Sequence, residues 1–250
     1  MKLTREERAA RKASFQKMGM ADKVEYLYTY YKLPILLAVI ASALLCSAVY
    51  RQFTKKEIIL YSAHVNVSVG DTIESRLNAE FISSTGANPK KAEVYLYRGL
   101  YLSESPSEEN HQYMYASRLK ILASIEATQL DVVLMNQEAY DILSHNGYLL
   151  ELPDFLSADV SLNRFLEPYL TSNTVILEDN AVEYHLNEAD QYVAITEECV
   201  NGIDVSEFPM FSDAGFPDRV YLGVIANSPR LANALQYIEY LTSTTVGTQN

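Results

Sequence analysis

The longest apolar stretch of the chain is residues 33–50, which contain no charged side chain. A helix of this length spans roughly 27 Å, close to the hydrocarbon thickness of a bilayer. Tyrosines flank the run, and tyrosine is enriched where membranes meet water. The pattern predicts one transmembrane helix in contact with the lipid bilayer, and a buried core helix is the alternative. The run has no ionisable residue, so we expect it to act only as a tether.

The charges on the two sides of this run differ in sign. Residues 1–32 contain eight Lys or Arg and four Asp or Glu. Residues 51–250 contain twelve Lys or Arg and twenty-eight Asp or Glu. Because basic flanks stay inside, we expect a cytoplasmic arm over residues 1–32 and an extracytoplasmic domain over residues 55–245 at the cell membrane. The long basic head and the long apolar run favour an uncleaved anchor over a cleaved signal peptide.

Alternating and helical patterns follow one another through the first half of the exported domain. The expected strands and helices alternate in the order 55–69, 71–85, 92–102, 111–128, 130–135 and 137–146. This order predicts an α/β domain with a largely parallel sheet covered by helices. In the second helix, Tyr115, Leu119, Leu122 and Ile125 share one face, which we expect to be its apolar face.

The second half of the domain has weaker patterns. Residues 174–177, 192–196 and 220–226 are typical of short strands, and residues 200–219 are rich enough in Gly and Pro to predict a loop. Residues 231–241 form a strongly amphipathic helix, which Ser228 and Pro229 are expected to start.

Two stretches carry a resemblance to a known family. Residues 118–152 combine an amphipathic helix, a strand opening with Asp131-Val132-Val133, a helix ending at Gly147, and a Leu-Leu pair before a Pro-Asp pair. Residues 223–241 combine a strand, an Asn-Ser cap and a helix. Both stretches resemble the extracellular solute-binding proteins of bacterial ABC importers.

The resemblance implies a periplasmic-binding-protein-like domain of type II. One lobe would comprise residues 57–150 and 220–241, and a small second lobe would comprise residues 155–219. It also implies that the domain binds a small solute or a peptide without catalysis, in association with an ABC-type importer.

Composition narrows the possible partners. The acidic tail lacks a basic stripe, which argues against nucleic acid and against anionic lipid as ligands. The only cysteines are Cys46, inside the apolar run, and Cys199 in the tail, so we expect no intramolecular disulfide.

Catalytic and metal-binding patterns are missing from the sequence. The four histidines are scattered without metal-ligand spacing, and no glycine-rich phosphate loop occurs. Cys199 follows Glu197 and Glu198, which should raise the pKa of its thiol and make it a poor nucleophile. The acidic residues of 178–190 resemble a solvated face more than a calcium loop. We therefore expect neither enzymatic activity nor a cofactor or metal.

A ligand cleft in an α/β domain lies at the carboxyl ends of the strands. Polar residues follow four expected strands and are the candidate ligand-binding residues: Asn66, Ser68, Tyr101, Ser103, Asn136, Gln137 and Asn227. The alternative function is that of a structural or regulatory subunit, whose domain docks onto a membrane protein partner and binds no small molecule.

Overall fold

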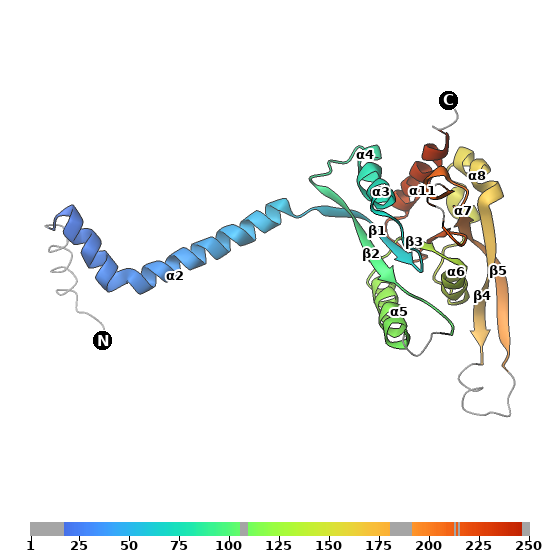
Figure 1. Ribbon diagram of the computed structural model, residues 1–250, viewed down its shortest axis with the longest axis horizontal. Helices are drawn as coiled ribbons and strands as arrows, with labels where there is room; N and C mark the ends of the chain where they lie inside the picture. Colours follow the sequence, from blue (N-terminus) through green and yellow to red (C-terminus); the bar gives the residue numbers. More distant parts are fainter. Residues whose placement is uncertain (1–17, 106–109, 181–191, 213, 215, 247–250) are drawn as a thin grey trace. The chain divides into compact units, whose positions relative to one another are not determined.

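The computed structural model describes residues 18–105, 110–180, 192–212, 214 and 216–246 (Figure 1). The chain divides into two compact units, Met1–Lys55 and Lys56–Asn250, and each is described by itself.

In the described part of the first unit, residues 18–55, the chain forms the long helix α2 (Met20–Thr54). Large apolar side chains are exposed along it: Leu33, Leu36, Leu37, Val39, Ile40, Leu44, Leu45 and Val49. Among the residues whose side chains are described, which do not include Ile35 and Ala48, no helix has both the length and the apolar character that a membrane span requires. Of the expected cytoplasmic arm, residues 1–17 lie outside the described residues.

The second unit is built on one mixed sheet with the strand order β2-β1-β3-β6-β5-β4. Its strands are β1 (Glu57–Val65), β2 (Ala92–Leu100), β3 (Val132–Met135), β4 (Leu170–Asp179), β5 (Ala194–Asp204) and β6 (Tyr221–Val224). The expected α/β class is confirmed. The expectation of a largely parallel sheet is wrong for half of it. β1 is parallel to its two neighbours, β2 and β3. The other three pairs, β3 with β6, β6 with β5, and β5 with β4, are antiparallel.

Two apolar clusters lie on opposite faces of this sheet, because successive strand side chains point to opposite sides. Val132 and Leu134 of β3 belong to one cluster, and Val133 and Met135 belong to the other. Helices α5 (His111–Glu126) and α6 (Gln137–His145) cover the Val133 face. The helices on the opposite face are α3 (Asp71–Ser75), the π-helical turn η1 (Arg76–Glu80), α4 (Phe81–Ser84), α7 (Leu152–Leu156), α8 (Val160–Leu166), α10 (Pro209–Ser212) and α11 (Leu231–Val246).

Residues 155–219, expected as a small second lobe, contribute to this same sheet and core. Phe208 and Phe211 share one buried cluster with Leu60 of β1. β5 extends to Asp204 and pairs with β6, and α10 spans Pro209–Ser212, so the expectation of a loop over residues 200–219 is wrong for these two segments. The short 3-10 turn η2 (Glu167–Tyr169) leads from α8 directly into β4.

Helix α5 packs with a different face from the one its apolar pattern indicates. Ser117, Ile121, Ser124 and Ile125 are buried, whereas Tyr115 and Leu119 are exposed. The buried face is therefore partly made of small polar side chains. A pattern based on apolar residues alone cannot identify such a face.

A buried ion pair fastens the last helix to the sheet. Asp131, which precedes β3, accepts hydrogen bonds from the backbone N–H of Tyr61 (2.7 Å), the hydroxyl of Ser228 (2.6 Å) and Nε of Arg230 (2.8 Å). Arg230 also donates to the carbonyl of Thr128. This single carboxylate therefore joins β1, β3 and the segment that leads into α11.

A second buried network fastens the β4–β5 hairpin to α6. The hydroxyl of Tyr140 donates to Oδ1 of Asn201 (2.8 Å), and Nδ2 of Asn201 donates to Oγ of Ser144 (2.8 Å). Ser144 in turn donates to the carbonyl of Thr174 (3.0 Å). A Cβ atom at Gly202 would lie 2.7 Å from the Tyr140 ring, so only glycine leaves room for this contact.

Candidate functional site

The sheet has a topological switch point between β1 and β3. β1 lies between β2 and β3, and the chain crosses from one side of β1 to the other between these two parallel strands. Ligands of open α/β sheets bind at the carboxyl ends of the strands that flank such a point. Asn66 and Asn136 directly follow β1 and β3, at the edge where the sequence predicts a ligand site.

These two asparagines hydrogen-bond to each other. Nδ2 of Asn66 donates to Oδ1 of Asn136 (3.1 Å) and to the carbonyl of Leu102 (2.6 Å). The backbone N–H of Leu102 donates back to Oδ1 of Asn66 (2.9 Å). Asn66 has a left-handed backbone (φ 58°), which asparagine tolerates better than most residues. The centre of the switch point is therefore closed by hydrogen bonds within the protein.

Asn136 also sets the position of α6. Its Oδ1 accepts the backbone N–H of Ala139 (3.0 Å), which makes it the N-terminal cap of that helix. The first turn of α6 is also fixed by Glu138, whose Oε1 accepts hydrogen bonds from the hydroxyl of Ser103 (2.7 Å) and the backbone N–H of Glu104 (3.1 Å). The loop after β2 is thereby held against the first turn of α6.

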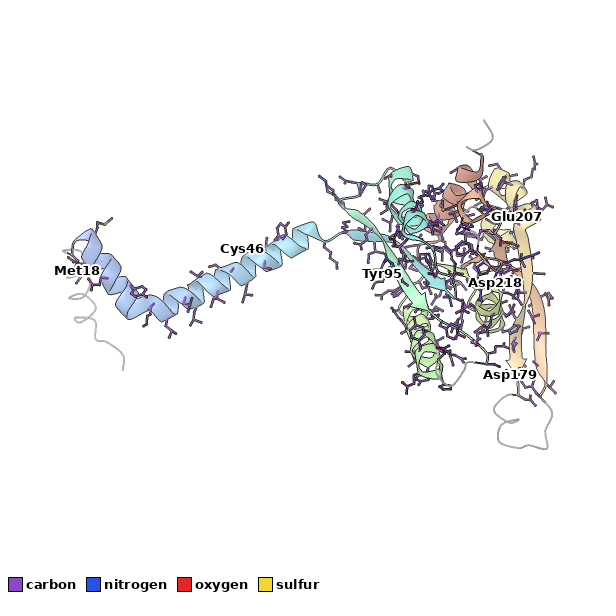
Figure 2. The ribbon with its side chains drawn as sticks, in the orientation of Figure 1. Met18, Cys46, Tyr95, Asp179, Glu207 and Asp218 are labelled. Atoms are coloured by element: carbon purple, nitrogen blue, oxygen red, sulfur yellow. The ribbon has the colours of Figure 1, made fainter. Side chains whose placement is uncertain are left out.

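An open pocket of about 510 Å³ lies beside this closed centre. It is lined by Glu104, Asn136, Gln137, Glu138, Asp141, His145, Asp218, Arg219 and Tyr221. Because β6 is antiparallel to β3, Tyr221 pairs with Met135, and the residues that precede β6 meet the start of α6. Figure 2 labels Asp218 in this region. The volume falls within the range of small-molecule sites.

The pocket is polar and carries an excess of negative charge. Glu104, Glu138, Asp141 and Asp218 contribute carboxylates, whereas Arg219 contributes the single guanidinium of the lining. Nη1 of Arg219 also lies 3.5 Å from a carboxylate oxygen of Asp204, outside this lining. The lining therefore favours a ligand that carries positive charge.

Tyr221 contributes an aromatic ring to the pocket lining, and this ring packs on the buried ring of Tyr140. The rings of Tyr140 and Tyr221 stack with centroids 4.9 Å apart. Burial raises the pKa of both phenols above the ordinary value for tyrosine. In the same lining, Oδ1 of Asp141 accepts hydrogen bonds from Nε2 of Gln137 (2.7 Å) and Nδ2 of Asn173 (2.8 Å), which hold this carboxylate in place.

The seven candidate residues from the sequence have different places in the structure. Asn136 and Gln137 line the pocket, and Asn66 and Ser103 lie next to it through their hydrogen bonds. Ser68 is exposed and Tyr101 stacks on Tyr113, and neither lines the pocket. Asn227 donates to the carbonyl of Ile125 (2.9 Å) at the opposite end of the sheet. It lies there because β6 runs antiparallel to β3, which the sequence did not reveal.

Sequence reasoning missed most of the charged lining. Asp141 and His145 follow the predicted residue Gln137 at intervals of four, so the three share a helix face, and this spacing could have identified Asp141 and His145. Asp218 and Arg219 precede β6 and reach the pocket only because that strand is reversed. No local signal marks that reversal.

The described residues contain no group of three or more His, Cys, Asp or Glu that could hold a metal ion. Three acidic residues of the run 178–190, namely Glu183, Glu188 and Asp190, lie outside the described residues. Burial, with smaller contributions from Glu197, Glu151 and Glu198, raises the pKa of the Cys199 thiol. The thiol is therefore protonated and weakly nucleophilic at neutral pH.

Comparisons with protein-family models, with curated proteins and with solved structures find no match to this chain.

Proposed function

We propose that this protein is a membrane-anchored, extracytoplasmic binding protein for a small solute or peptide that carries positive charge. The observation that carries the proposal is the polar pocket of about 510 Å³, where four carboxylates and one guanidinium line the carboxyl edge of β3. Binding would be non-catalytic. The resemblance to solute-binding proteins supports a type II-like fold for the domain and a place beside an ABC-type importer.

The anchor is residues 33–50 of α2, with the N-terminus in the cytoplasm. The uncharged run and the opposite charges on its two sides support this orientation. Large apolar side chains are exposed along α2, such as Leu37, Val39 and Leu44. Their exposure supports insertion of α2 in the membrane, because lipid would cover them.

The test is a thermal-shift panel on the full chain in nanodiscs of uncharged lipid. The probes are a four-carbon diamine, arginine, trilysine, succinate and glucose. A ligand at one hundred times its Kd adds about 2.7 kcal/mol of stability. We expect the melting temperature to rise with at least one cationic probe and to remain unchanged with succinate and glucose.

Pocket variants connect the shift to the site. The double variant Asp218→Asn/Glu104→Gln removes two lining charges, and we expect it to weaken binding about tenfold, or about 1.4 kcal/mol. The matched control, Glu93→Gln/Glu126→Gln, removes two exposed charges outside the lining and should bind as the parent does. An equal loss in both variants would contradict binding in this pocket.

A structural or regulatory subunit is the second candidate. The hydrogen bond between Asn66 and Asn136 favours it, because this bond engages polar groups at the switch point that a ligand would otherwise contact. A folded sample that responds to no probe of the panel would refute the binding proposal and favour this alternative.

A further inference from the structure

The β4–β5 hairpin continues well beyond the part of the sheet that supports it. β5 pairs with β6 only through Ile203 and Asp204, whereas β4 and β5 pair with each other as far as Asp179 and Ala194 (Figure 1). Figure 2 labels Asp179 at the far end of β4. Among the strands that the structure describes, β4 pairs with β5 alone, so β4 is an edge of the sheet.

The far half of the hairpin exposes apolar side chains. Leu177, Val193 and Ile195 are 56%, 60% and 56% exposed, whereas Asn201, Gly202 and Ile203 of the supported half are buried. An edge strand with exposed branched side chains is a template for another strand. Natural edges of this kind are usually short, charged with lysine, or covered by a partner.

The charge of the hairpin determines which partner fits. No Lys or Arg occurs between Arg164 and Arg219, and Glu178, Glu197 and Glu198 are exposed beside the apolar residues. A second copy of the hairpin would bring like charges opposite each other, which destabilises strand pairing. A segment that carries Lys or Arg between apolar residues would match both the charge and the exposed apolar surface.

We propose that the outer edge of β4 binds an extended segment of a partner protein in which basic and apolar residues alternate, and that the segment adds a strand to the sheet. Backbone hydrogen bonds would supply affinity, and the glutamates would select basic side chains. The proposal goes beyond solute binding, because Leu177, Ile195 and the three glutamates do not line the pocket.

The test measures binding of a labelled decapeptide of alternating Val and Lys to the full chain in nanodiscs of uncharged lipid, by fluorescence anisotropy at 150 mM salt. We expect saturable binding. The same peptide with alternate backbone amides methylated cannot pair as a strand, and we expect it to bind at least tenfold more weakly. A Val-Glu peptide should not bind.

Two variants locate the surface. Glu178→Lys/Glu197→Lys reverses the charge on exposed strand positions, and we expect at least a tenfold loss of affinity. The matched control, Glu93→Lys/Glu126→Lys, reverses two exposed charges elsewhere and should stay within twofold of the parent. Asp218→Asn, a pocket variant, should also leave peptide binding unchanged, so failure of this proposal is distinguishable from failure of solute binding.

Four results would overturn the proposal. The first is absence of saturable binding to the parent protein, and the second is equal binding of the methylated peptide, which would indicate charge attraction alone. The third is an equal loss in the control pair. The fourth is a dimer, measured by light scattering, that the hairpin variant dissociates, because a second copy would then occupy the edge.

Discussion

The replacement Asp131→Ala tests how much the buried ion pair contributes to the fold. The carboxylate of Asp131 is fully buried, and its three donors come from Tyr61, Ser228 and Arg230. Removal leaves the guanidinium of Arg230 without its carboxylate and the N–H of Tyr61 without its acceptor. Breaking a buried pair in this way typically costs about 3–5 kcal/mol.

The variant Asp131→Asn should cost less, about 1–2 kcal/mol, because an amide can still accept from Arg230 and Tyr61 while the Ser228 hydroxyl turns to accept from it. The third variant is Arg230→Met, which leaves the carboxylate without its cation. Because both single replacements break the same pair, the double variant Asp131→Ala/Arg230→Met should cost less than the sum of the two by about 1–3 kcal/mol.

Urea denaturation of Lys56–Asn250, followed by far-ultraviolet circular dichroism, measures these free energies, since this part of the chain is one compact unit. With a slope of about 2–3 kcal/mol per molar, Asp131→Ala should lower the midpoint by about 1.5 M. The control Glu126→Ala, an exposed residue, should change stability by less than about 0.5 kcal/mol. A loss below about 1 kcal/mol for Asp131→Ala, or strict additivity in the double variant, would refute the reasoning.

Two further predictions use the same assay. Gly202→Ala places a Cβ within 2.7 Å of the Tyr140 ring and should cost about 2–4 kcal/mol, whereas Gly70→Ala, with open space around it, should stay within about 0.5 kcal/mol. Equal costs would contradict the close packing at Gly202. Burial, and to a lesser extent Arg98, lowers the pKa of His64 from 6.5 to about 4. The unfolded chain therefore binds a proton at His64 more readily, so stability should fall by roughly 3 kcal/mol as the pH drops from about 6.5 to about 4. The variant His64→Gln should not show this loss of stability at low pH. An identical pH dependence of stability in the variant and the parent would contradict the role assigned to His64.

The first half of the domain was predictable because its signals are local. β1, β2 and β3 read as apolar runs separated by helical patterns, and such alternation builds parallel units from neighbouring segments. The edge carrying Asn136 and Gln137 followed from this order, because the carboxyl ends of parallel strands lie together.

The second half depended on contacts that no local pattern encodes. Gly202 contributed to the prediction of a loop from residue 200, but it lies within β5, where its missing side chain admits the ring of Tyr140. The direction of β6 follows from its pairing with β3, so the arrival of Asp218 at the pocket and of Asn227 at the opposite end could not be inferred.

The proposed functions depend on the proposal that α2 is inserted in the membrane and that Lys56–Asn250 lies outside the cell. In a background of Cys46→Ser and Cys199→Ser, a single cysteine is placed by Ser83→Cys, an exposed site in the domain, or by Ser14→Cys in the N-terminal arm. Intact cells are treated with a membrane-impermeant maleimide, and permeabilised cells serve as the control. We expect Ser83→Cys to be labelled in intact cells and Ser14→Cys only after permeabilisation, with both proteins retained in carbonate-washed membranes. Labelling of Ser14→Cys in intact cells with protection of Ser83→Cys, or loss of the protein from washed membranes, would contradict a membrane-anchored extracytoplasmic binding domain.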